Sequence, residues 1–299
     1  MSPGRACGCR HGEGEHNTAT DDHGEWGYYA ERWKDAQLTP AGQGQASAVG
    51  QALAAATAPP AALELICASP LTRTLQTAQH IAAQLPGSPP PIIALEAVRE
   101  RLDGAQPANA RRPRSELQAD YPDIDFSALA EDDDTAFEEV RQIVKETVGG
   151  RAEEGEEPAL HTLANYGFSR ANSERALAAV AAEEDDELSR TTAAVRWLKE
   201  QAGLEPLFTE WTPYEDDSGT AVRVAAFLAW LSARPESELL VSTHCMFLYT
   251  LFGRSDPMAD VMACEEDVDG SYFARGERRT VQILFPPTTE ADSGGRPKL

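Results

Sequence analysis

Two histidines and two arginines are spaced along the sequence in a way that suits phosphoryl chemistry. Arg10 and His11 begin the run RHGEGEHN, Arg73 lies in SPLTRTLQTA, and His244 ends a short apolar run. A neutral imidazole offers a lone pair that can attack phosphorus, while guanidinium groups hold the phosphoryl oxygens and offset their charge. The set therefore predicts a phosphate pocket that needs no metal ion and no cofactor.

A carboxylic acid would complete this set. Glu100, in VRERLDG, follows the strand candidate at 91–95 and would supply a general acid to the pocket. Proton donation requires a neutral carboxyl group, so we expect burial to raise the pKa of Glu100. Glu96 is the alternative acid. His16, His23 and His80 do not follow predicted strands, and we expect them to be surface or helix histidines.

The elements that must position these residues alternate between strands and helices. Short apolar runs predict strands at 63–67, 91–95, 239–244 and 281–285, and helical spacing predicts helices at 39–60, 71–85 and 219–233. This alternation predicts an α/β fold with a mostly parallel sheet flanked by helices. The carboxyl ends of parallel strands share one edge of a sheet, where open α/β folds bind their ligands.

The residues before Arg10 depart from the usual composition of a central strand. Gly4–Cys9 contain no Val, Ile, Thr or aromatic residue, which are the types that pack well on a buried sheet. We therefore expect either a weak central strand or a chain that lacks the start of that strand.

The middle of the chain is acidic and differs from the rest. Residues 131–157 contain eleven acidic and three basic residues, and helical patterns follow at 159–164, 173–182 and 189–202. We expect a three-helix insertion over residues 157–203, within an α/β domain formed by residues 1–150 and 205–285. The tail, residues 286–299, is expected to be disordered.

Composition excludes some partners. The chain has 299 residues and a formal net charge of −23, which argues against nucleic acid and anionic membranes as partners. A phosphorylated small molecule or a phosphoprotein can still bind a local cationic pocket.

Five cysteines form no even disulfide framework, and no signal-like or membrane-spanning apolar run is present. We therefore expect a soluble cytoplasmic protein, with a nuclear or organellar location left open.

The combined segments resemble the histidine phosphatase superfamily, the phosphoglycerate mutase-like proteins. Within it, they are most similar to a branch found in plants, algae and fungi. The matching pieces are RHGEGEHN at 10–17, DAQLTPAGQGQA at 35–46, SPLTRTLQTA at 69–78, VRERLDG at 98–104, RRPRSEL at 111–117, YPDIDFSAL at 121–129, STHCMFL at 242–248 and FARGER at 273–278.

The resemblance implies a role for each residue of the pocket. His11 would be the phosphorylated nucleophile, Arg10 and Arg73 would bind phosphoryl oxygens, His244 would complete the pocket, Asn17 would hold the phosphate or the first loop, and Glu100 would be the proton donor. Arg111, Arg112 and Arg114 would either line the substrate entrance or lie in solvent.

The implied activity is that of a metal-independent, histidine-type acid phosphatase, which hydrolyses a phosphomonoester through a phosphohistidine. A phosphoglycerate mutase-type phosphotransferase and a catalytically inactive binding scaffold are the alternatives. The true mutases carry Ser where this chain has Gly14 and an aromatic residue where it has Leu102-Asp103. These differences favour hydrolysis.

Residues 159–201 resemble a ubiquitin-associated (UBA) domain. Tyr166, Gly167 and Phe168 match its Met-Gly-Phe loop, with Tyr in place of Met, and Leu198 lies on the matching third helix. In such domains these positions form an exposed apolar patch, so ubiquitin is a candidate partner. The alternative is a helical lid in which Tyr166, Phe168 and Trp197 form only its own core.

Overall fold

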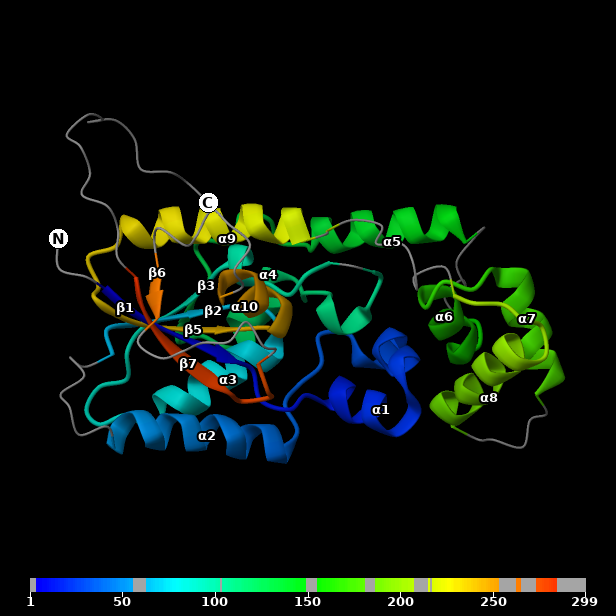
Figure 1. The fold of residues 1–299 in the computed structure, drawn as a ribbon, viewed down its shortest axis with the longest axis horizontal. Helices are drawn as coiled ribbons and strands as arrows, with labels where there is room; N and C mark the ends of the chain where they lie inside the picture. Colours follow the sequence, from blue (N-terminus) through cyan, green and yellow to red (C-terminus); the bar gives the residue numbers. More distant parts are fainter. Residues whose placement is uncertain are drawn as a thin grey trace.

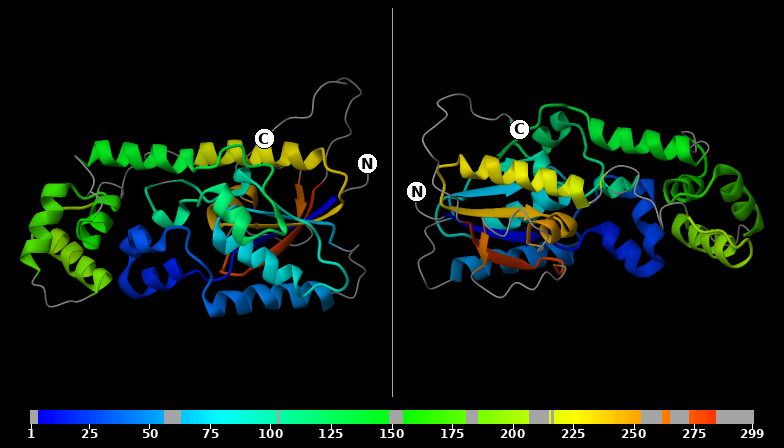
Figure 2. Two further views of the ribbon diagram at one scale, coloured as in Figure 1. Left: turned by 180° about the vertical axis from the view of Figure 1, so that it is seen from behind. Right: turned by 45° about the horizontal axis from the view of Figure 1, so that its top comes forward.

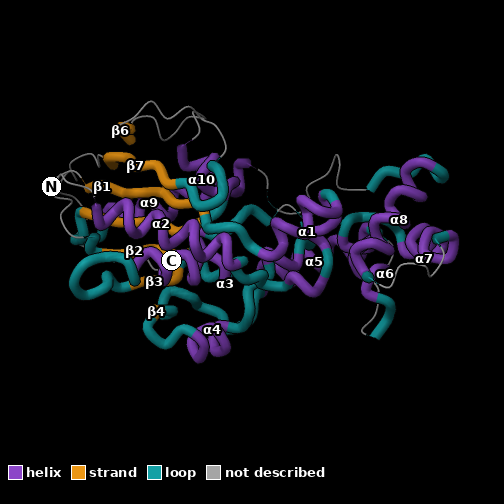
Figure 3. The backbone as a smooth tube through the Cα atoms, turned by 90° about the horizontal axis from the view of Figure 1, so that it is seen from below, coloured by secondary structure: helices purple, strands orange, loops and turns teal. Residues whose placement is uncertain are grey.

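The computed structural model describes residues 4–55, 63–102, 104–148, 155–180, 186–206, 215, 217–252, 262–264 and 273–283. Within them the strands form one seven-stranded sheet in the order β4-β3-β2-β5-β1-β7-β6 (Figure 3). Strands β4, β3, β2, β5 and β1 are parallel, and β7 and β6 continue the sheet in antiparallel fashion. The strands are β1 (Gly4–Arg10), β2 (Leu65–Ala68), β3 (Ile92–Ala94), β4 (Ile124–Asp125), β5 (Glu238–Thr243), β6 (Met262–Cys264) and β7 (Arg278–Ile283).

Helices cover both faces of this sheet, as the α/β prediction requires (Figure 1). Helices α9 and α10 pack on one face, and α2 and α3 pack on the other. The helices are α1 (Glu15–His23), α2 (Pro40–Ala55), α3 (Thr72–Ala82), α4 (Arg114–Asp120), α5 (Thr135–Thr147), α6 (Pro158–Asn165), α7 (Arg170–Ala179), α8 (Glu187–Glu200), α9 (Asp217–Ser232) and α10 (Cys245–Phe252). Short 3-10 helices are η1 (Glu25–Tyr29), η2 (Glu31–Trp33), η3 (Glu96–Val98) and η4 (Pro107–Asn109).

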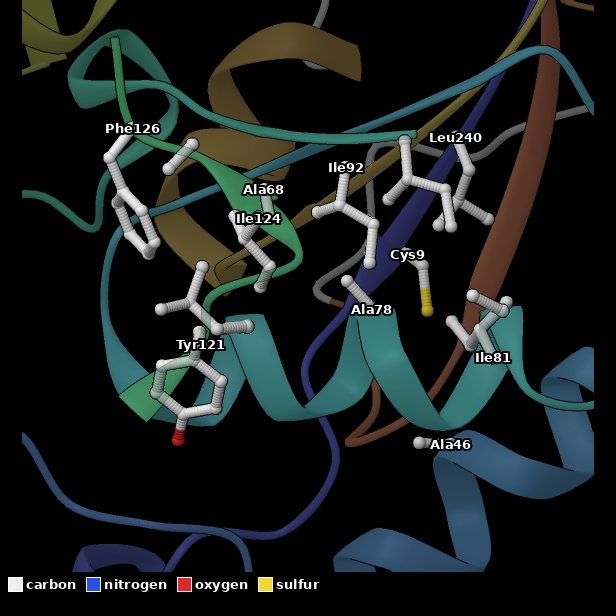
Figure 4. Close-up of a cluster of buried hydrophobic side chains, with 14 of the residues drawn as sticks. Cys9, Ala46, Ala68, Ala78, Ile81, Ile92, Tyr121, Ile124, Phe126 and Leu240 are labelled. Carbon is white, nitrogen blue, oxygen red and sulfur yellow. The ribbon is translucent and has the colours of Figure 1, made fainter. Parts of the chain in front are cut away.

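Alternate side chains of each strand pack into hydrophobic cores on opposite faces of the sheet. Leu239 and Val241 of β5 face α9 and α10, whereas Leu240 between them faces α3. Figure 4 shows the second core, where Ile81 of α3 lies beneath the sheet near Cys9. Because every β5 residue from Leu239 to Thr243 is buried, this strand reads as one continuous apolar run ending in polar residues.

Strand β1 forms despite its small residues. It pairs in parallel with β5 from Arg5 to Arg10 and antiparallel with β7 from Gly4 to Cys9. A Cβ atom on Gly8 would lie 2.9 Å from Leu248 and Phe252 of α10. The large side chains over Gly8 therefore come from the helix, which leaves no room for a side chain at this position. The composition that predicted a weak strand reflects this close packing.

Helices α6, α7 and α8 form a separate group beyond the end of the sheet, and α1 lies between that group and the sheet (Figures 1 and 2). The acidic stretch before them contains α5, which composition alone did not predict. Its buried Phe137, Val140 and Val144 pack against Leu102 and Ala105. The predicted tail, 286–299, and the end of the predicted 39–60 helix lie outside the described residues. No described helix has the length and apolar character needed to span a membrane.

Candidate active site

The carboxyl ends of β1, β2 and β5 bring three predicted residues together. Arg73 begins α3 after β2, and its Nε donates to Nε2 of His11 across 3.3 Å. Its Nη2 donates to Nδ1 of His244 across 3.2 Å. The ring centroids of His11 and His244 are 5.2 Å apart, and all three side chains are buried. Residues that are far apart in sequence thus meet at one sheet edge.

The hydrogen bonds of His11 define its neutral form. Nδ1 lies 2.6 Å from the carbonyl oxygen of Gly12, which can only accept, so Nδ1 carries the proton. Burial, followed by the charges of Arg73 and Arg10, lowers the pKa of His11 well below its ordinary value. Nε2 therefore keeps its lone pair at neutral pH, which is the form that a nucleophile requires.

Arg73 is fixed by three kinds of partner. Besides the two histidines, its Nη1 donates to the carbonyl oxygen of Ala108 at 2.5 Å and its Nη2 to Oδ1 of Asn109 at 2.8 Å. Burial lowers the pKa of Arg73 to about 10, and the charge of Glu100 opposes this shift. The guanidinium is therefore charged at neutral pH and held at the base of the pocket.

Arg10 and a further arginine contribute positive charge. Nη1 of Arg10 donates to the carbonyl oxygen of Phe273 at 2.7 Å, and its buried Nε has no hydrogen-bond partner among the described residues. Arg275 pairs with Asp21 at 2.7 Å and lies 3.5 Å from Glu13. Its charge also lowers the pKa of His11. Sequence reasoning noted the FARGER segment but did not select Arg275.

Glu100 reaches the same edge from the segment after β3. Its Oε1 accepts from the backbone N–H of Arg101 at 2.9 Å and from that of Met246, in the first turn of α10, at 3.2 Å. The side chain is half-buried. The alternative acid, Glu96, lies 2.7 Å from Arg111 and 3.2 Å from Arg99, and these ion pairs engage it elsewhere.

Asn17 holds the first loop. Its Oδ1 accepts from the backbone N–H of Gly14 at 2.9 Å, and its Nδ2 lies 3.1 Å from Nε2 of His16 and 3.2 Å from the hydroxyl of Tyr28. Asn17 was expected to hold either the phosphate or the first loop. These contacts describe the hold on the first loop.

His16 is a helix histidine, which is one of the two placements expected, but it does not lie at the surface. It lies in the first turn of α1, but only 3% of it is exposed, and its ring centroid is 5.9 Å from that of His11. The chain turns back at Gly14 directly after β1, so the start of α1 stays beside the sheet edge. The short spacing between His11 and His16 was the signal that strand-end reasoning overlooked.

Arg111, Arg112 and Arg114 follow η4 and were expected either to line the substrate entrance or to lie in solvent. Their contacts fit neither role completely. Arg111 is buried, and its Nη atoms donate to backbone carbonyl oxygens, including that of Asp132 at 2.7 Å. Arg112 pairs with buried Asp35 at 3.1 Å. Arg114 donates to the carbonyl oxygen of Leu129 at 2.7 Å. Arg111 and Arg114 thus hold the loop before α5, whereas Arg112 also pairs with Asp120 at 2.7 Å.

A cavity of about 550 Å³ adjoins the site at Glu100. Its walls come from η3, the segment 128–136 and α9, and they combine apolar residues such as Leu95 and Leu102 with charged residues such as Arg223. This volume falls in the range of small-molecule sites. Glu100 therefore borders a space large enough for an organic group.

The apolar patch expected on the insertion is not exposed. The exposed fractions of Tyr166, Phe168 and Leu198 are 4%, 2% and 0%, and Gly167 is buried between the first two. The ring of Tyr166 packs 5.2 Å from that of Tyr29 in η1, measured between centroids. Because η1 covers the loop with aromatic side chains, the exposure typical of a ubiquitin-binding face is absent from this arrangement.

Comparison with known proteins adds independent findings. A model of the histidine phosphatase superfamily (branch 1) matches residues 9–203, more than half of the chain. A phosphoglycerate mutase-like protein of Arabidopsis thaliana is 31% identical over 171 residues, which cover 48% of this chain and 62% of the relative. Phosphoglycerate mutase-like protein 1 of the same plant is 28% identical over 163 residues, covering 46% and 57%. The matched part of the chain thus spans less than two thirds of either relative.

Two solved structures illustrate the structural comparisons. The phosphoglycerate mutase of Bacillus anthracis is 14% identical with a TM-score of 0.42, and the match covers 94% of this chain and 91% of the mutase. The ecdysone phosphate phosphatase of Bombix mori, in complex with tungstate, is 15% identical with a TM-score of 0.42, covering 98% and 96%.

Proposed function

Because the chain belongs to the histidine phosphatase superfamily, we propose that it is a metal-independent phosphatase that hydrolyses a phosphomonoester through a phosphohistidine at His11. The observation that carries this proposal is the fixed neutral form of His11, with Nδ1–H bonded to Gly12 and Arg73 lying against Nε2. A second, finer proposal is membership of the plant, algal and fungal branch, supported by the Arabidopsis thaliana relatives.

The first step transfers the phosphoryl group to His11. The Nε2 lone pair forms the N–P bond while the bond between phosphorus and the leaving oxygen breaks. Arg73 and Arg10 hold the phosphoryl oxygens and stabilise the charge that develops on them. Glu100, in its protonated form, gives its proton to the leaving oxygen, so that the product departs as a neutral alcohol.

The second step releases inorganic phosphate. The Glu100 carboxylate takes a proton from water, the water oxygen forms a bond to phosphorus, and the N–P electron pair returns to Nε2 of His11. The backbone donors of Arg101 and Met246 orient Glu100 throughout this cycle. The cavity beside Glu100 supports placing the organic part of the substrate on that side. A phosphorylated small molecule and a phosphoprotein both remain substrates to test.

Loss of the nucleophile is the decisive test. We expect His11→Ala to abolish hydrolysis of p-nitrophenyl phosphate and the acid-labile phosphohistidine trapped during turnover. His80→Ala is the matched control, because His80 is half-buried on α3. We expect this variant to keep both the hydrolysis and the trapped phosphohistidine. Equal hydrolysis by the His11→Ala protein would contradict the mechanism.

The same experiment separates the alternative functions. A mutase would transfer the trapped phosphoryl group to a hydroxyl of an added phosphoglycerate and not to water, whereas an inactive scaffold would form no phosphohistidine. A screen over phosphorylated metabolites and phosphopeptides, with the His11→Ala protein as the blank, would then identify the substrate class.

Ubiquitin binding by the helices α6, α7 and α8 is a separate proposal, supported by the resemblance of residues 159–201 to ubiquitin-associated domains and by the acidic residues that flank them. Because Tyr166 and Phe168 are covered, binding at the loop would require η1 to move away from them. An NMR titration of the whole 15N-labelled chain with ubiquitin tests this, and unchanged spectra at millimolar ubiquitin would contradict it.

A cytoplasmic location is also part of the proposal. Cys9 and Cys67 are fully buried in the sheet, and burial raises the pKa of both thiols, that of Cys67 to about 12. Inert, reduced cysteines of this kind suit a reducing compartment. Fluorescence microscopy of the tagged chain, with fractionation, would test this location.

A further inference from the structure

We propose that His16 is a third imidazole of the phosphate pocket and donates a hydrogen bond from Nδ1 to the bound phosphoryl group. This inference rests on the proposed phosphatase function and adds a binding residue to it. The sequence motifs assigned no role to His16. Its proposed role rests on its contacts in the first loop.

The protonation of His16 follows from a chain of hydrogen bonds. The backbone N–H of Gly14 can only donate, so the atom of Asn17 that it meets at 2.9 Å is the oxygen Oδ1. The other amide atom of Asn17 is then the donor Nδ2, which lies 3.1 Å from Nε2 of His16. Nε2 must accept, and in a neutral ring the proton is therefore on Nδ1.

The Nδ1–H group of His16 needs a hydrogen-bond acceptor. Nδ1 of His16 is buried and has no hydrogen-bond partner among the described residues. A buried N–H group without an acceptor is costly, so such groups in native proteins usually meet water or a ligand. An anion bound beside His11, whose ring centroid is 5.9 Å away, would supply the missing acceptor.

Residue 14 must lack a side chain for this arrangement to exist. A Cβ atom on Gly14 would lie 2.6 Å from Cε1 and 2.7 Å from Nδ1 of His16. The imidazole thus occupies the space beside the loop that a side chain at position 14 would fill. Gly14 leaves the space that the imidazole fills. The hydrogen-bond donor beside the loop is therefore His16 of α1 and not a side chain at position 14.

The surrounding charges favour a neutral donor. Burial first, and then the charges of Arg73, His11, Arg10 and Arg275, lower the pKa of His16 well below its ordinary value. The ring therefore adds a hydrogen bond to the pocket without adding another positive charge. The ring should therefore stay neutral across the physiological pH range, with Nδ1 as its donor.

Direct phosphate binding tests the proposal without relying on turnover. Isothermal titration of the whole chain with inorganic phosphate would compare the wild type with His16→Asn and His16→Phe. Asn can present an amide donor near the position of Nδ1, whereas Phe keeps the ring and removes both nitrogens. We expect His16→Phe to weaken phosphate binding at least about tenfold and His16→Asn to recover most of that loss. Gly14→Ala should resemble His16→Phe.

NMR of the wild-type chain labelled with 15N in its histidines gives a second readout that needs no variant to fold. We expect the ring signals of His16 to show a neutral, Nδ1-protonated form that shifts when inorganic phosphate is added. Unchanged His16 signals in phosphate, or unchanged phosphate affinity in a folded His16→Phe protein, would overturn the inference. Failure of the phosphatase proposal would appear separately, as the absence of phosphohistidine in the wild type.

Discussion

The two sides of η1 differ in how they are held. On one side, Tyr28 packs against His16 with ring centroids 5.4 Å apart, and its hydroxyl accepts from Asn17 at 3.2 Å. On the other side, Tyr29 and Trp26 pack against Tyr166 of the insertion. The pocket side depends on directional hydrogen bonds, whereas the insertion side combines aromatic packing with hydrogen bonds such as that from Nδ2 of Asn165 to the carbonyl oxygen of Tyr29 at 3.1 Å.

This difference sets how each side responds to change. A single lost polar partner in the pocket leaves another buried atom unsatisfied, so small chemical changes have specific effects on binding and catalysis. Aromatic packing tolerates small changes but loses stability with lost volume. One short segment therefore joins a site sensitive to single atoms to a module sensitive to packing.

Acid should affect the pocket side most strongly. Burial lowers the pKa of His11, His16 and His244 below the ordinary value of about 6.5 that they regain on unfolding. Below that pH the unfolded chain binds more protons than the folded one, so their contribution to stability is present above about pH 6.5 and falls as the pH decreases. We expect a loss of about 1.4 kcal/mol per pH unit from each histidine, measured by urea unfolding.

A variant sharpens this prediction. His16→Phe should remove one proton from the pH dependence of unfolding, because the buried His16 ring would no longer titrate. An equal pH dependence in the wild type and His16→Phe would show that His16 does not contribute to the acid sensitivity.

Removing an aromatic ring should affect the insertion side. We expect Tyr166→Ala to lower the free energy of unfolding by about 3 kcal/mol, because its buried ring packs against Tyr29, Trp26 and Phe168. Phosphate affinity at a temperature where the variant is folded should stay within about twofold of the wild type. Arg175→Ala, at the exposed face of α7, is the control and should cost under about 0.5 kcal/mol. A large loss of phosphate affinity in Tyr166→Ala would show that the two sides are coupled.

The smallest effect is expected from single hydroxyl groups, one on each side of η1. Tyr28→Phe removes an acceptor of Asn17 and should lower kcat/KM for p-nitrophenyl phosphate about fivefold, which corresponds to a hydrogen bond of about 1 kcal/mol. Thr192→Val removes the acceptor of the Trp26 indole on the insertion side and should leave kcat/KM unchanged. Equal effects of the two variants would remove the distinction between the sides.

The sequence predicted the sheet edge well because the information there is local. Apolar runs that end in polar residues located β2 and β5, and the parallel arrangement then required Arg73 and His244 to lie near His11. What the sequence could not supply was the path of the chain between elements. The return of the chain at Gly14, which buries His16, depends on a hydrogen bond from that glycine to Asn17.

Other differences arise from partners distant in sequence. The glycine at position 8 of β1 is explained by Leu248 and Phe252, which belong to α10. The loop of Tyr166 has the pattern of an exposed patch, but η1 covers it, and no pattern within the insertion indicates η1 as its neighbour. Charged side chains were equally ambiguous, because Arg111 looks like a surface residue until its carbonyl partners are known.

The position of β1 between β5 and β7 has a consequence for the order of folding. Arg5 pairs with Glu238 on one side and with Gln282 on the other, so both partner strands of β1 lie far from it in the sequence. Such non-local pairing closes long loops and forms late, after local helices and hairpins. His11 follows this strand directly, so the nucleophile takes its place when the last strands dock. We therefore expect Arg10, the last residue of β1, and His11 to join Arg73 and His244 late in folding.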